Sequence, residues 1–137
     1  GKTNNYYFDH DKIFIQIKNP KDLEKYIDQI YQMELRKKIV ELNQIMEPNL
    51  KAHKLYLVPT HIKKYKSRFG VCDVINKEIT INLFLAKIDP SYLLYVLYHE
   101  YSHLRVPNHS KEFYLLLSKL FPNYLIIRKE LKMIAIN

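Results

Sequence analysis

Six prolines are spread over a chain of 137 residues that has only two glycines, and they restrict where helices can begin and end. Proline suits the first turn of a helix but interrupts a helix interior, because its φ is fixed and it has no amide hydrogen. Pro20 and Pro90 each follow a residue that favours a helix N-cap, Asn19 and Asp89. Pro48, Pro107 and Pro122 predict helix ends. The predicted helices are Pro20 to near Pro48, Pro90 to about Leu104, about 110–120 and about 124–135.

Hydrophobic periodicity supports this division. In the first segment apolar residues recur at steps of three to five, as expected for one helix face. They are Leu23, Ile27, Ile30, Leu35, Ile39, Leu42 and Met46. Residues 6–17 and 53–82 instead alternate like strands, and 65–73 and 78–82 form a plausible hairpin. The predicted fold is therefore α+β, with a long N-terminal helix, a small antiparallel sheet and then C-terminal helices.

Composition narrows the class of protein. The length fits a single domain, 1–137, and 47% apolar residues can supply a core. No apolar stretch approaches the roughly 20 residues of a membrane-spanning helix, so no membrane partner is expected.

A single cysteine, Cys72, cannot form an internal disulfide, which favours the cytoplasm. The same thiol is interpreted as a small apolar strand residue. The net charge of +8 can attract phosphates but equally fits a solvated lysine surface.

The candidate catalytic and metal-binding residues lie in the segment after Pro90. This segment contains His99-Glu100-Tyr101-Ser102-His103, the pattern HExxH. Helical residues four apart lie about 40° from each other, so both imidazoles can reach one cation from one face. Glu100 lies beside them and can take a proton from a metal-bound water. The alternative is that both histidines are hydrogen-bonded core residues and Glu100 is a paired surface acid.

His109 is the candidate third ligand, and it requires a helix break. Six further helical residues would turn it about 240° away from His103. Pro107 disfavours helical geometry at Val106 and cannot donate to the helical ladder, so the chain can turn back there. Three imidazoles with one open position are typical of a catalytic zinc site, whereas structural zinc sites usually have four protein ligands. Glu112 is the nearest acid that could orient a ligand imidazole.

Several segments together resemble one protein family. They are Lys66-Ser67-Arg68-Phe69-Gly70-Val71-Cys72, Ile79-Thr80-Ile81-Asn82, Pro90, Tyr95-Val96, the HExxH run with Leu104, Asn108-His109-Ser110 and Phe113. This combination resembles the YgjP-like metal-dependent hydrolases, relatives of SprT-like and other small gluzincin-type zinc peptidases, over about residues 53–124. The resemblance implies a zincin-like minimal core. Departures from the family pattern at Phe69, Val71 and the pair after Glu100 concern substrate preference.

The resemblance also implies roles for particular residues. His99, His103 and His109 are the implied zinc ligands, and Glu100 is the implied catalytic acid/base. A zinc-dependent hydrolase, and within that class a metallopeptidase acting on a peptide or protein, is therefore predicted. Arg68, Tyr65 and Tyr101 are candidates for contacting the substrate or the transition state, chosen by their position in the sequence alone. Asn82 is expected to fix the loop between the hairpin and the next helix.

Two rival functions remain open at this point. Some YgjP-like members are described as nucleoside triphosphate hydrolases, and the basic surface would suit a nucleotide. Against this, the sequence has no P-loop and no acidic cluster for magnesium. A DNA-associated module is the other rival, because SprT-like relatives act on protein bound to DNA. Salt-sensitive DNA binding that survives Glu100→Gln would distinguish it. The sequence does not predict the oligomeric state.

Overall fold

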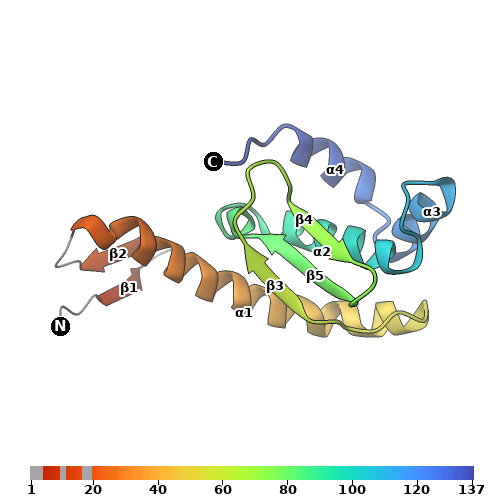
Figure 1. Cartoon of the computed structure of the whole chain (residues 1–137), viewed down its shortest axis with the longest axis horizontal. Helices are drawn as coiled ribbons and strands as arrows, with labels where there is room; N and C mark the ends of the chain where they lie inside the picture. The colour runs from red at the N-terminus through yellow and green to blue at the C-terminus, as the bar shows by residue number, and fades with distance from the viewer. Residues whose placement is uncertain (1–4, 10–11, 17–19) are drawn as a thin grey trace.

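The computed structural model describes residues 5–9, 12–16 and 20–137. The chain begins with an antiparallel hairpin of β1 (Asn5–Asp9) and β2 (Lys12–Gln16), which lies at the N-terminal end of the first long helix (Figure 1). The strand predicted over 6–17 is thus two strands. A short 3-10 turn, Pro20–Asp22, precedes helix α1 (Leu23–Ala52), whose N-cap is Asp22. Asn19, the predicted N-cap, lies outside the described residues.

Helix α1 continues past Pro48, where the prediction ended it. Met46 and Leu50, on either side of Pro48, are both fully buried in the core. Burial of a large side chain is worth about 1.5–3 kcal/mol, so the two together are enough to offset the roughly 3 kcal/mol that an interior proline costs. The helix instead ends at Ala52, and Lys54 then adopts a positive φ of 59°.

The sheet has the order β3-β5-β4, with β3 (Thr60–Lys63), β4 (Gly70–Asp73) and β5 (Glu78–Asn82). β4 and β5 form the predicted hairpin, joined by a turn in which Asp73 accepts hydrogen bonds from Ile75 and Asn76. The sheet is mixed, however, and the prediction of a wholly antiparallel sheet is wrong. β4 occupies one edge of β5, so β3 pairs with the other edge, and the 64–69 connection makes that pairing parallel.

Four helical elements complete the fold. They are the 3-10 helix η2 (Leu83–Lys87), α2 (Pro90–Arg105), α3 (Lys111–Leu120) and α4 (Tyr124–Lys132). Helix α2 packs against β4, β5, α3 and α4. Figure 1 shows α2 behind the sheet and below α4. It begins as predicted, with Pro90 in the first turn and the Asp89 carboxylate accepting from the Ser91 amide. None of the helices in the described part of the chain has the length and apolar content to cross a membrane. The long helix, the small sheet and the later helices confirm the α+β prediction.

Candidate metal centre

Three imidazoles meet where α2 ends. His99 and His103 lie one turn apart on α2, which stops at Arg105, and Val106 takes an extended conformation. The chain then turns back through Pro107, and His109 precedes the first residue of α3. One potential ligand atom from each of His99, His103 and His109 lies within 4.8 Å of the other two. The break predicted between His103 and His109 is therefore present, and it brings the three rings together.

Phe113 is the platform on which the three rings pack. Its side chain is fully buried at the start of α3. The centroid of its ring lies 5.0 Å from that of His99, 4.4 Å from that of His103 and 5.1 Å from that of His109. Contacts on all three imidazoles restrict their rotation. Phe113 thus belongs to the support of the site, a role that its place in the sequence motif did not specify.

His103 has the orientation and charge state of a metal ligand. Its Nδ1 lies 3.2 Å from the Val106 carbonyl oxygen, so Nδ1–H can donate there and Nε2 keeps its lone pair. That Nε2 lies 3.1 Å from Nε2 of His109. Burial lowers the pKa of His103, and the neighbouring His99 and His109 lower it further, against the opposing effect of Glu100. A neutral imidazole is the form that binds a metal. Glu112, the predicted orienting acid, makes no hydrogen bond or ion pair to an imidazole among the described residues, and the Val106 carbonyl orients His103 instead.

Glu100 is the acid of the site. It is only 5% exposed, and its Oε2 lies 3.3 Å from Nδ1 of His99. The opposite wall is β4, where Gly70 comes close to the helix: a β-carbon there would lie 2.8 Å from Cγ1 of Val96 and 3.0 Å from Oε2 of Glu100. The backbone of β4 and the carboxylate can approach this closely only because residue 70 has no side chain.

Gly70→Ala should therefore disturb Glu100 more than it disturbs the metal ligands. We expect a loss of about 1–3 kcal/mol in unfolding free energy from overpacking, and a fall in any hydrolytic turnover with metal content unchanged. Thermal unfolding, metal content and turnover of the purified variant test this. Ser67→Ala, in the exposed loop before β4, is the matched control. Wild-type stability and turnover in Gly70→Ala would contradict the close-approach argument.

Asn82 fixes the loop that carries Arg68 and Phe69. Its side chain is 2% exposed and its Nδ2 donates to the carbonyl oxygens of Tyr65 (2.9 Å) and Arg68 (2.8 Å). Its Oδ1 accepts from the amide of Phe84. The predicted role of Asn82 after the hairpin agrees with its N-cap bond to Phe84 at the start of η2. Its bonds to Tyr65 and Arg68, which were not predicted, also fix the loop between β3 and β4.

Of the three residues predicted to contact the substrate or the transition state, one lies at the site and two do not. Arg68 lines the two cavities next to His99 and Glu100. Tyr101 is fully buried and points away, with its hydroxyl accepting from the Val58 amide at 3.1 Å, so the prediction that it contacts substrate is wrong. Tyr65 lines a different cavity, between α1 and η2, where its ring lies 5.6 Å from Nζ of Lys63. Adjacency in sequence suggested both tyrosines, but helix and loop geometry directs them elsewhere.

Cys72 lies in β4 and is half-buried. Burial, with smaller contributions from Glu100 and Asp73, raises the pKa of its thiol to about 11. Among the described residues the metal-binding group consists of the three histidines and does not include Cys72. Its interpretation as a strand residue and not a ligand fits this placement.

The raised pKa predicts slow alkylation of Cys72. At pH 8 a thiol with a pKa of about 11 is about 0.1% thiolate, against roughly 10% for an ordinary thiol, and only the thiolate reacts. Iodoacetamide should therefore modify folded Cys72 about 100-fold more slowly than the unfolded chain, as measured by mass spectrometry over time. The rate should rise as pH increases towards 11. Equal rates in folded and unfolded protein would contradict the burial argument.

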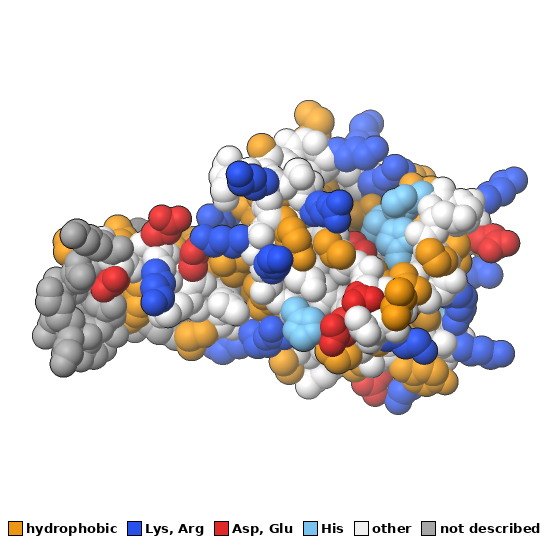
Figure 2. All heavy atoms as spheres, viewed as in Figure 1, with side chains coloured by type: hydrophobic (Ala, Val, Ile, Leu, Met, Phe, Trp, Pro, Cys, Tyr) orange, Lys and Arg blue, Asp and Glu red, His pale blue; other side chains and the backbone are white. Residues whose placement is uncertain are grey.

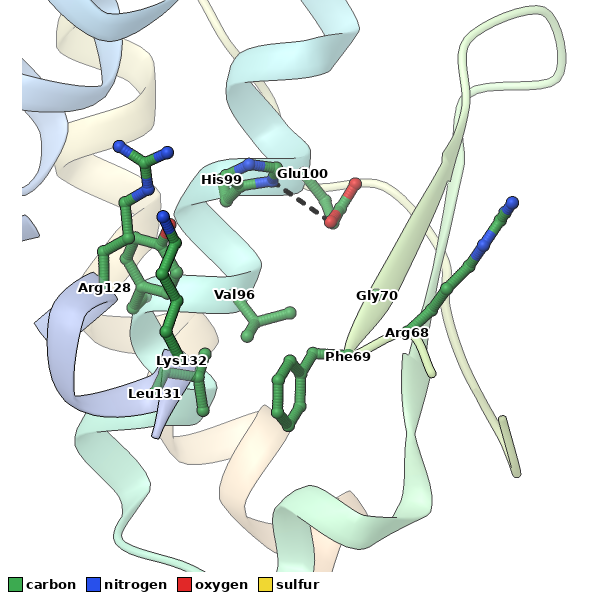
Figure 3. Close-up of a pocket in the computed structure, with 10 residues that line it drawn as sticks. Arg68, Phe69, Gly70, Val96, His99, Glu100, Arg128, Leu131 and Lys132 are labelled. Atoms are coloured by element: carbon green, nitrogen blue, oxygen red, sulfur yellow. Dashed lines mark hydrogen bonds and ion pairs between the residues drawn. The ribbon is translucent and has the colours of Figure 1, made fainter. Parts of the chain in front are cut away.

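Two cavities border the metal centre, and both are lined by His99 and Glu100. One, of about 330 Å³, includes His99, His103, His109 and β4 residues 70–72. The other, of about 260 Å³, lies towards α4 and is drawn in Figure 3. Figure 2 shows histidine side chains at the surface of this face, with Lys and Arg side chains near them. His99 and Glu100 thus border a cavity towards β4 and another towards α4.

Comparison with known proteins agrees with this geometry. The chain resembles the crystal structure of the metallopeptidase zymogen of Pyrococcus abyssi abylysin, with a TM-score of 0.60 and 20% identity over 69% of this chain and 92% of the other. At that identity the likeness shows the fold, which is zincin-like as predicted. No curated protein matches the chain. A family model described as "YgjP-like, metallopeptidase domain" matches residues 3–133. The family implies a metal ion, which the three histidines are placed to bind. The chain belongs to the YgjP-like metallopeptidase domain family.

Proposed function

We propose that the protein is a zinc-dependent peptidase in which His99, His103 and His109 hold the ion and Glu100 is the catalytic acid/base. The observation that carries this proposal is the convergence of three imidazole ligand atoms beside a buried carboxylate. Three histidines fit zinc well, since imidazole is a preferred ligand of zinc and three protein ligands leave one position for water or substrate. A bound zinc ion would supply Lewis acidity and activate water near neutral pH.

Glu100 carries the proton transfers in this proposal. As water attacks the scissile carbonyl carbon, Glu100 accepts a proton from it. It then returns that proton to the leaving amine, so the base of the first step is the acid of the second. The Glu100 carboxylate lies between Gly70 and His99, and these contacts restrict its movement between the two proton transfers.

The free edge of β4 favours a peptide as the substrate. β4 is an outer strand of the described sheet, and residues Gly70, Val71 and Cys72 border the histidine cavity. An extended peptide can add to such an edge through main-chain hydrogen bonds, which would place its carbonyl groups near the metal centre. Nucleotide hydrolysis commonly uses magnesium held by carboxylates. Among the described residues the one group that could hold a metal is the three histidines, which favours peptide over nucleotide as the substrate.

The test of this function is a parallel assay on two substrate classes. Purified protein loaded with one equivalent of zinc is incubated with pools of unstructured peptides and, separately, with nucleoside triphosphates. We expect peptide cleavage that is lost on chelation and restored by zinc, with no triphosphate hydrolysis above the chelated control. Zinc-dependent triphosphate hydrolysis without peptide cleavage would reject the peptidase assignment. Salt-sensitive DNA binding without any hydrolysis would favour a DNA-associated module instead.

A further inference from the structure

A cavity between α2, the β3–β4 loop and α4 has an apolar floor and a basic rim. Its volume is about 260 Å³, smaller than a typical pocket for a drug-sized ligand and suited to one amino-acid side chain. Phe69, Val96 and Leu131 form the floor, and His99 and Glu100 border it. We call it the α4 pocket, because α4 supplies Leu131 and both rim cations described next.

Arg128 and Lys132 form the rim on the side of α4. They lie one helical turn apart, so their side chains project from the same face. Figure 3 shows both extending past Leu131 towards the level of His99, whereas Arg68 extends away from the floor residues. Two cations therefore stand beside the candidate catalytic residues, above an apolar surface.

Neither rim cation has an acidic partner within the described part of the chain. The guanidinium of Arg128 lies 5.2 Å from the centre of the Tyr114 ring, a contact that positions it without neutralising it. The neighbouring acid in sequence, Glu130, instead accepts a hydrogen bond from the Tyr92 hydroxyl at 2.7 Å. The Tyr95 hydroxyl, in the same pocket, makes no hydrogen bond to a described residue. The pocket thus offers two positive charges and a hydroxyl that are available to a ligand.

We propose that the α4 pocket selects substrates that place an apolar side chain on Phe69, Val96 and Leu131 and a carboxylate between Arg128 and Lys132. This proposal rests on the peptidase function proposed above and names its substrate class. The carboxylate has two sources in a peptide, the C-terminal carboxylate of the apolar residue itself or the side chain of an adjacent Asp or Glu. In either case the charged and apolar groups must be neighbours, as the floor and rim are.

The test uses two matched peptide pairs with the zinc-loaded protein. One pair carries Phe-Glu or Phe-Gln inside the chain, and the other ends in Phe as the free acid or the amide. We expect kcat/KM to favour the charged member of one pair by about tenfold, since charge-assisted hydrogen bonds are the strong ones. The pair that shows the preference identifies the source of the carboxylate. Equal rates within both pairs would overturn the proposal.

Charge variants connect the preference to the rim. In the double variant Arg128→Gln and Lys132→Gln the ratio of kcat/KM for the charged peptide to that for its neutral partner should fall to about one. Lys132→Glu, which leaves Arg128 and its Tyr114 contact in place, should also abolish the preference. Lys129→Gln is the matched control, because Lys129 is exposed on α4 and does not line the pocket. A preference retained in both rim variants would overturn the proposal.

A binding measurement separates this proposal from the peptidase assignment. Short N-acetylated versions of the same four compounds are titrated into chelator-treated protein and followed by NMR, so that a carboxylate cannot coordinate the metal. Tighter binding of a charged compound, lost in the double variant, supports the α4 pocket even if no peptide is cleaved. Equal binding within both pairs overturns the proposal even if the protein is a peptidase.

Discussion

Glu100→Gln is expected to keep the bound metal and to lose turnover by about 10²–10⁴-fold, the usual contribution of a general acid/base. The amide has nearly the same shape as the carboxylate, so the narrow space between Gly70 and His99 should accommodate it. It cannot accept the proton of an attacking water. The histidines are unchanged, and metal content should remain at about one ion per chain.

This variant separates catalysis from metal binding. Turnover and metal content are measured on the same preparation, together with Glu112→Gln, which removes an exposed acid from the neighbouring helix. The control should keep both properties. Turnover in Glu100→Gln close to that of the wild type would reject Glu100 as the base, and loss of metal would mean that its carboxylate supports the ligand set directly.

Local sequence signals predicted the elements around the metal centre well. The start of α2 depends on the capping carboxylate of Asp89 and on Pro90, and its end on Pro107, and each of these acts on neighbouring residues only. The convergence of His99, His103 and His109 follows from helix periodicity and that single break. Such features need no information from distant parts of the chain, which is why the sequence alone could predict them.

Features that depend on long-range packing were not predictable in the same way. Pro48 is tolerated inside α1 because Met46 and Leu50 are buried against elements far away in sequence. The parallel pairing of β3 with β5 depends on which edge β4 leaves free. Tyr101 was chosen for its neighbours in sequence, but the helix turns its ring into the core.

The two rim cations of the α4 pocket could not be predicted from the sequence either. Arg128 and Lys132 belong to no motif, and in the sequence they were part of a general positive charge. Only the packing of α4 against α2 brings them to the cavity beside His99 and Glu100. The sequence therefore identified residues that can act in chemistry, and the tertiary fold adds those that can select a substrate.

His103→Ala is expected to reduce zinc affinity by about 100-fold or more, since loss of an orienting partner alone typically costs 10–100-fold and this change removes a ligand. His103 is the best-defined of the three, because the Val106 carbonyl orients its ring and Phe113 stacks on it. Metal analysis after dialysis should find about one zinc per chain in the wild type and almost none in the variant.

His61→Ala is the matched control for this loss. His61 lies on β3, is exposed and pairs with Glu78 at 3.6 Å, so the variant should retain its zinc. Circular dichroism of both variants separates loss of a ligand from loss of the fold. A folded His103→Ala protein with a full complement of zinc would reject the ligand assignment. Loss of zinc in His61→Ala as well would mean that zinc binds at a site other than the predicted one, because the imidazole of His61 does not belong to the group formed by His99, His103 and His109.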